Sequence, residues 1–270
     1  MLFRSGAGGT LAYLTDNESH INTFTVGDVK IDLVEENWDP TDEDDDGVPD
    51  AAEDAVPNQE IEKDPRVVKA EDANDTVVFL RVTAPVRDVS LVADDGTVTP
   101  HEVQEIFFFK QNSDAHDAHA NHWGDNWVLL AETDGVDENG AAQKTYVFGY
   151  AKPLTESAPE TTKLFEKVQL KNVIENEVSA DEIQNVRVEA FAIQADNVLA
   201  EGQSADELGK SDLSAIYDVF VKQNGEIDEN GNMVWSRFQE EGHGQTAKEA
   251  DTNNELNLKN EPLAKDGGQG

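Results

Sequence analysis

Residues 77–82 (VVFLRV) and 186–193 (VRVEAFAI) are the two stretches of sequence that decide the fold. Both are rich in β-branched and aromatic residues, and their apolar side chains alternate or run without a break instead of recurring at helical spacing. Each stretch therefore predicts a β-strand with at least one buried face.

Shorter stretches of the same kind occur on either side of these two. Val29, Ile31 and Leu33 share one face of a strand near the N-terminus, because successive side chains of a strand point to opposite faces. Acidic or glycine-bearing loops separate the apolar stretches, as is typical of turns. At least seven strands are predicted in all, the others lying at residues 89–92, 106–109 (IFFF), 127–130 (WVLL) and 146–150 (YVFGY).

Helix signals are few. Ser179 precedes Glu182 by three residues, which is the spacing of a capping box, and Ser211 opens the segment LSAIYDVF in a weaker version of the same pattern. Many short strands with one or two short helices predict an all-β fold, a jelly-roll-like β-sandwich over residues 27–238 with an acidic loop at 39–56. Residues 239–270 are poor in apolar side chains and predict a disordered acidic tail.

The charge of the chain restricts its partners. Of 270 residues, 57 are acidic and 20 are basic, so the formal net charge is −37. Such a charge repels phosphate backbones and anionic lipids, so we expect no nucleic-acid partner.

No apolar run approaches the roughly 18 residues of a membrane helix, so no membrane span is expected. The absence of cysteine excludes disulfides, thiol nucleophiles and cysteine-based zinc sites.

The N-terminal segment is expected to combine the remnant of a leader with a first strand. Residues 1–9 (MLFRSGAGG) are too short for the hydrophobic region of a signal peptide. The small residues that follow are typical of a cleavage site. We therefore interpret residues 1–26 as a truncated or rebuilt leader followed by an N-terminal strand segment.

Several blocks of this sequence resemble one protein family. The blocks 9–16 (GTLAYLTD), 22–29 (NTFTVGDV), 57–65 (PNQEIEKDP), 146–150 (YVFGY) and 190–195 (AFAIQA) are similar to the TasA/camelysin family of exported matrix proteins. The resemblance implies secretion through a dedicated signal peptidase, a jelly-roll subunit, and assembly into biofilm-matrix fibres outside the cell or at its surface. Self-association is thus expected, and contacts with other matrix components are compatible with it.

A strand-exchange mechanism for such assembly can be formulated from the residues alone. Edge strands carry unpaired backbone N–H and C=O groups, to which an extended segment of another chain can add. The segment 10–26 suits this role, because it carries apolar side chains in a largely alternating pattern. The alternative is that it forms the first strand of its own domain. The predicted assembly residues are Leu11, Tyr13, Ile21, Phe24 and Val26.

An acidic motif at residues 42–53 (DEDDDGVPDAAE) predicts a calcium site. It fits the spacing D-x-D-x-D-G-x₅-E, in which carboxylates, one backbone carbonyl and a terminal glutamate surround a hard cation, and Gly47 permits the sharp turn. The alternative is a solvated acidic loop without a bound ion. The predicted calcium ligands are Asp42, Asp44, Asp46, the carbonyl of Val48, Asp50 and Glu53.

A histidine cluster is a second candidate metal site. His116, His119 and His122 are spaced by three residues in DAHDAHANHW, a spacing that could place imidazoles on one face of a helical turn. The polar surroundings favour the alternative, an exposed loop without an ordered transition metal, and zinc is not expected.

The chain has no HExxH motif, so we expect a structural protein and no enzyme. A secreted metallopeptidase and a calcium-stabilised adhesive sandwich are the alternatives.

Calcium should raise the melting temperature of the protein, because an ion that binds only the folded state stabilises it by mass action. The measurement is thermal unfolding with calcium and with EDTA, combined with calorimetric titration. Asp46→Ala and Glu53→Ala should each weaken binding. An unchanged melting temperature together with no heat of binding would contradict the site.

Overall fold

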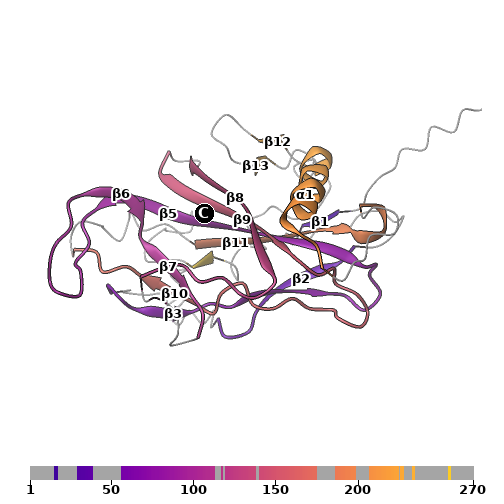
Figure 1. Ribbon diagram of the computed structural model, residues 1–270, viewed down its shortest axis with the longest axis horizontal. Coiled ribbons are helices and arrows are strands. Elements are labelled where there is room, and N and C mark those ends of the chain that lie inside the picture. Colours follow the sequence, from indigo (N-terminus) through magenta and orange to yellow (C-terminus); the bar gives the residue numbers. More distant parts are fainter. Residues whose placement is uncertain are drawn as a thin grey trace, which may run out of the picture.

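The computed structural model describes residues 15–17, 29–38, 56–112, 117, 119–137, 140–174, 186–198, 207–224, 226–227, 233–234 and 255–256. About these residues it shows an all-β, sandwich-like fold with one α-helix, as expected from the sequence (Figure 1). The elements are β1 (Thr15–Asn17), β2 (Ile31–Glu35), β3 (Glu60–Glu62), β4 (Pro65–Lys69), β5 (Thr76–Val89), β6 (Glu102–Glu105), β7 (Phe107–Lys110), β8 (Trp127–Val136), β9 (Ala142–Tyr150), β10 (Lys167–Leu170), β11 (Val186–Gln194), a 3-10 turn (Ala195–Asn197), α1 (Lys210–Asn224), β12 (Glu226–Ile227), β13 (Met233–Val234) and β14 (Glu255–Leu256).

The larger sheet is antiparallel and is built around β5. Its strand order is β1-β11-β5-β9-β8, with β14 added to β11 and β6 added to β5. Eight residues of β11 pair with β5, from Arg187 opposite Thr83 to Gln194 opposite Thr76. Strand β9 pairs with the other side of β5, from Phe79 opposite Gly149 to Pro85 opposite Gln143. The two long stretches that decide the fold are therefore direct neighbours.

Two small sheets form the second layer. One has the order β3-β10-β7 and the other consists of β2 and β4. Strands β3 and β4 are separated only by Lys63 and Asp64, so the chain passes from one small sheet to the other at these two residues. Strand β2 runs antiparallel to β4, with Ile31 opposite Lys69 and Glu35 opposite Pro65.

Each face of the larger sheet buries its own apolar cluster. Val78, Leu80 and Val82 of β5 face the second layer, where they join the aromatic residues of β7 and β9. Val77 and Phe79 face the opposite side, where Leu213 and Phe220 of α1 cover them (Figure 1). Both faces of β5 are therefore buried, which explains why its sequence is an unbroken apolar run.

The helix α1 packs closely onto β9. A Cβ atom built on Gly149 would lie 3.1 Å from Cδ2 of Leu213, which is tighter than most real contacts. The glycine inside the otherwise aromatic stretch YVFGY therefore lets the helix approach the sheet. The N–H of Gly209 donates to Oδ2 of Asp212 (3.2 Å) and caps the start of α1.

Most predicted elements are found close to their predicted positions. The stretch 89–92 differs: β5 extends to Val89, and Leu91 and Val92 make only isolated bridges. The helix predicted after Ser211 is present, but it begins at Lys210, so Ser211 lies inside its first turn and does not cap it. The capping box at Ser179 and Glu182 lies outside the described residues. Sequence patterns did not predict β3, β4, β6 and β10, which are only three to five residues long.

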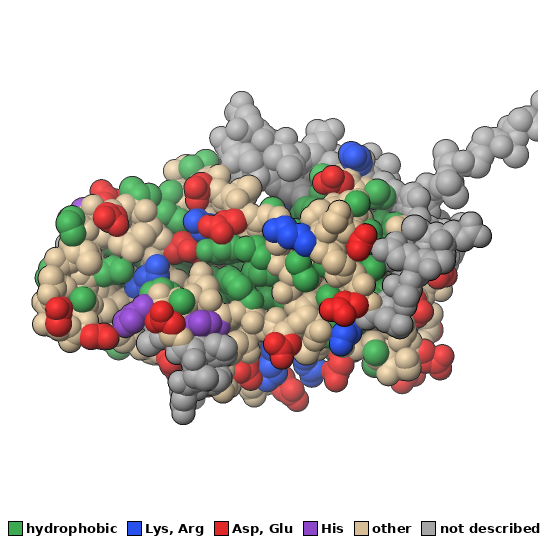
Figure 2. All heavy atoms as spheres, viewed as in Figure 1, with side chains coloured by type: hydrophobic (Ala, Val, Ile, Leu, Met, Phe, Trp, Pro, Cys, Tyr) green, Lys and Arg blue, Asp and Glu red, His purple; other side chains and the backbone are tan. Residues whose placement is uncertain are grey.

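Acidic side chains are dispersed over the surface of the described part of the chain. Figure 2 shows carboxylates across the visible face, with fewer lysine and arginine side chains between them. Several described carboxylates have cationic partners, such as Glu132 and Glu60, which lie near Lys144 and Lys167. In the whole chain, with 57 acidic and 20 basic residues, acidic side chains outnumber basic ones by 37. Within the described residues, no helix is long and apolar enough to cross a membrane.

Added salt should raise the melting temperature, because the net charge of −37 repels itself in the compact state. Screening shortens the Debye length from about 10 Å at 0.1 M salt to about 3 Å at 1 M. The measurement is thermal unfolding across this range of sodium chloride. A control series near pH 4, close to the sequence pI of about 4.2, should show a much smaller effect. An equal response at both pH values would contradict the electrostatic explanation.

Candidate functional site: the outer edge of the larger sheet

Strand β11 lies beside the edge of the larger sheet. One of its faces is apolar throughout, and the other is apolar at its second half but carries Arg187 and Glu189 at its first half, where Glu189 pairs with Arg81. Val188, Ala190 and Ala192 point into the core between the layers. Phe191 and Ile193 point toward α1. A strand added beside residues 191–193 therefore extends both cores only where it carries apolar residues at consecutive positions, whereas an alternating segment extends one of them.

Only short segments pair with the outer side of β11. Three residues of β1 lie opposite its second half, with Thr15 opposite Ile193 and Asn17 opposite Phe191. Two residues of β14 lie opposite Val186 and Arg187. Residues 188–190 have no strand beside them on that side in the described part of the chain. The backbone groups of an edge strand are a template for another extended segment.

The opposite edge of the sheet, strand β8, is protected in ways that β11 is not. A bulge interrupts the pairing of β8 with β9 between Leu129 and Ala131. Glu132 and Asp134 are exposed on the same strand. Bulges and charges are the devices by which sheet proteins prevent edge-to-edge association. The two edges of the larger sheet therefore differ in their capacity to accept a strand.

The structure places part of the predicted donor segment at the receptive edge. Residues 15–17, which lie within the segment 10–26, form β1 and pair with β11 of their own chain. The predicted assembly residues Leu11, Tyr13, Ile21, Phe24 and Val26 lie outside the described residues, and so do all the predicted calcium ligands in the loop 42–53.

The described histidines engage separate partners. Nε2 of His119 lies 3.1 Å from Oδ2 of Asp94. Nε2 of His122 donates to the backbone carbonyl of Asp117 (2.9 Å). His116 lies outside the described residues. Among the residues that are described, no three acidic or histidine side chains are arranged to hold a metal ion.

A buried polar cluster that the sequence patterns did not reveal lies between the layers. The hydroxyl of Tyr146 donates to Oε2 of Glu105 (2.6 Å), and Nδ2 of Asn121 donates to the hydroxyl of Tyr146 (3.5 Å). Oε1 of Glu105 is buried and has no partner among the described residues. Burial raises the pKa of Glu105, and burial also lowers the pKa of Lys171 nearby. No local signal marks Glu105, since it lies in a short strand with polar neighbours.

Comparison of the chain with protein-family models, with curated proteins and with solved structures gives no match. The assignment of a function therefore depends on the geometry of the chain itself.

Glu105→Gln should stabilise the protein at neutral pH by about 1 kcal/mol, because the amide still accepts from Tyr146 without the cost of a buried charge. The pKa of Glu105 is raised in the folded state, so folding favours the protonated side chain. The contribution of Glu105 to the stability of the protein therefore decreases as the pH rises through that pKa. The gain should therefore disappear in acid.

Chemical denaturation of both proteins at pH 7 and near pH 4 measures this difference. Glu102→Gln, at an exposed position of the same strand β6, is the matched control and should change stability little at either pH. A Glu105→Gln variant less stable than the parent at pH 7 would contradict the argument.

Proposed function

We propose that this protein is a secreted structural subunit of extracellular fibres, and that its subunits join head-to-tail by strand addition at β11. The observation that carries this proposal is the difference between the two edges of the larger sheet. Strand β11 offers residues 188–190 without a neighbouring strand in the described part of the chain, whereas β8 is bulged and charged. A single receptive edge favours association in one direction.

The pairing within the chain leaves room for exchange. Thr15, Asp16 and Asn17 are polar, and they pair with only three residues of β11. A segment that carries apolar residues extends the core beside β11 better than these three polar residues do. The stretches 11–14 (LAYL) and 21–26 (INTFTV) of a second subunit supply such residues. In this proposal, β1 marks the place that the donor segment of a neighbouring subunit occupies.

Donation of an N-terminal segment to the next subunit is a heterologous contact, and heterologous contacts that do not close into a ring yield filaments. Residues 15–17 of the donor segment pair with β11 of their own chain. In this proposal the segment leaves that position and pairs with β11 of the next subunit, so that donor and acceptor contribute different surfaces to each contact. We propose a structural and non-catalytic role, with calcium bound at residues 42–53 as a stabilising ion and with other matrix components as further partners.

Removal of residues 1–18 should give a folded monomer that does not polymerise. The deletion removes β1 and the first apolar part of the donor, but it leaves β2 and both apolar clusters of the sandwich. Circular dichroism should remain β-rich, while filaments in electron micrographs should disappear. A synthetic peptide of residues 10–26 should bind the truncated protein, because each buried apolar anchor contributes about 1.5–3 kcal/mol before association costs.

The matched control is the same peptide with Leu11→Asp and Phe24→Asp, which keeps its length and backbone but removes two anchors. This control peptide should not bind and should not stop the growth of full-length filaments. If the truncated protein still forms filaments of unchanged appearance, the assembly contact lies elsewhere.

A further inference from the structure

The corner between β3 and β4 buries a lysine against a glutamate. Lys63 is completely buried, and the side chain of Glu35 is 3% exposed. Nζ of Lys63 lies 2.8 Å from Oε2 of Glu35. Glu35 follows Ile31 and Leu33 at every second position of β2, so it occupies the face of the strand that otherwise faces the core.

Two polar atoms around this pair have no partner in the described part of the chain. They are Oε1 of Glu35 and Nε1 of Trp38, both buried. The indole ring of Trp38 also contacts the lysine, because Nζ of Lys63 lies 4.9 Å from its centre. A buried ion pair that stabilises a fold normally has its remaining hydrogen-bonding groups satisfied. The pair of Lys63 and Glu35 does not meet this condition.

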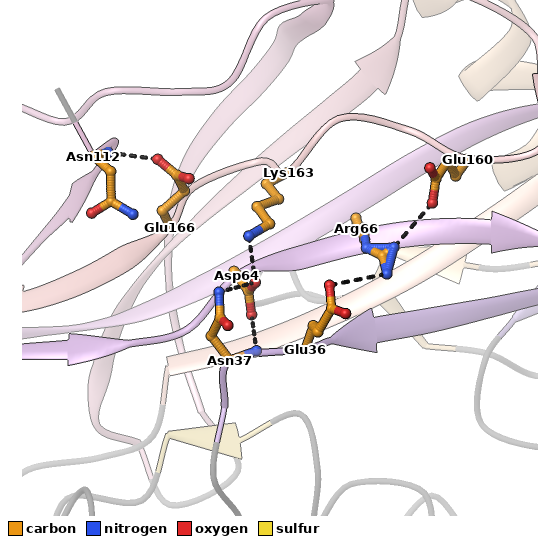
Figure 3. A network of polar contacts seen from close by, with 8 residues as sticks. All are labelled: Glu36, Asn37, Asp64, Arg66, Asn112, Glu160, Lys163 and Glu166. Carbon is orange, nitrogen blue, oxygen red and sulfur yellow. Dashed lines mark hydrogen bonds and ion pairs between the residues drawn. The ribbon is translucent and has the colours of Figure 1, made fainter.

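A polar network outside the pair holds the two backbone segments in place (Figure 3). Oδ1 and Oδ2 of Asp64 accept from the backbone N–H and from Nδ2 of Asn37, both at 2.9 Å. Nζ of Lys163 lies 2.8 Å from Oδ2 of Asp64. Asp64 directly follows Lys63 in the chain. Asn37 lies between Glu35 and Trp38 in the chain. The network therefore fixes the separation of the amine and the carboxyl group.

We propose that Lys63 and Glu35 form an intramolecular amide bond between Nζ and Cδ, which the folded protein makes by itself. This is a covalent cross-link between the end of β2 and the corner that joins β3 to β4.

The reaction balances without an added reagent. The ammonium of Lys63 transfers one proton to Oε2 of Glu35 along the 2.8 Å contact and becomes a neutral amine. The amine lone pair attacks Cδ and forms the new C–N bond. Oε2 then takes a second proton from the nitrogen, and the Cδ–Oε2 bond breaks to release water. An ion pair of zero net charge becomes a neutral amide and one water molecule.

The surroundings favour each part of this reaction. Burial raises the pKa of Glu35, mainly by desolvation, so the neutral acid is accessible in the site. A desolvated lysine is an effective nucleophile, and a fixed contact removes the entropic cost of bringing the groups together. Oε1 becomes the amide carbonyl.

The cross-link would close a loop of the chain that contains the acidic motif. Glu35 and Lys63 are 28 residues apart in sequence, and the residues 42–53 lie between them. A covalent closure of this length restricts the unfolded state and so stabilises the fold. It would also hold the base of the acidic loop whether or not an ion is bound.

Intact-mass spectrometry of the full-length protein tests the proposal. The mass should be lower than the sequence mass by one water molecule. Lys63→Arg keeps the charge but cannot form the amide, and its mass should equal its sequence mass. Glu35→Gln can form the same amide with loss of ammonia, and its mass should be lower by one ammonia. Lys144→Arg is the matched control, because Lys144 lies 2.7 Å from Glu132 in a more exposed pair and should keep the loss of water.

Peptide mapping locates the bond. Residues 31–62 contain no lysine or arginine, so trypsin should cut an unmodified chain after Lys63 and a cross-linked chain only after Arg66. Cleavage before aspartates should then release residues 32–38 and 54–63 as one joined species. An unmodified protein mass together with normal cleavage after Lys63 overturns the proposal. Neither result depends on whether the protein forms fibres, so the two proposals fail independently.

Discussion

The burial of β5 on both faces is the constraint on which the rest of this structure depends. Residues 77–80 are fully buried because α1 covers one face of the strand and the small sheets cover the other. A strand of this kind needs neighbours on both sides, and β9 and β11 provide them over most of its length. The three layers of the fold follow from that single requirement, since each apolar face of the sheet needs its own cover.

The same constraint explains why one edge of the sheet is receptive. Strand β11 has two buried faces like β5, but only short segments lie along its outer side. A strand with two largely buried faces has few positions for the charges that protect an edge, because an unpaired buried charge is costly, and the carboxylate of Glu189 in β11 is paired with Arg81. In strand β8, by contrast, Glu132, Thr133 and Asp134 are exposed. The extent to which other elements cover β11 and β8 therefore determines which edge can accept a strand and which edge is protected.

Periodicity and composition predicted the fold class and most long strands, because apolar runs such as 77–82 record burial directly. Short strands were not predicted, since three residues such as Glu60–Glu62 carry no period. The sequence predicted that an edge strand could accept another segment, but it did not identify β11 as that strand. The order of the strands in the sheet decides which strand lies at an edge, and sequence patterns do not give this order. The buried glutamates were missed for a similar reason: Glu35 and Glu105 belong to a chain with 57 acidic residues, and nothing local separates them from the exposed ones.

The position of the buried lysine connects the core to the proposed assembly. If subunits join through residues 10–26, tension along a fibre enters each subunit through the segment before β2. Strand β2 pairs with β4 through only five residues, so hydrogen bonds alone would resist that tension weakly. Glu35 is the last residue of β2, and Lys63 lies at the corner that anchors β4. A bond between them would pass the load to the centre of the sandwich after β2 alone had yielded, and the remaining strands would stay folded.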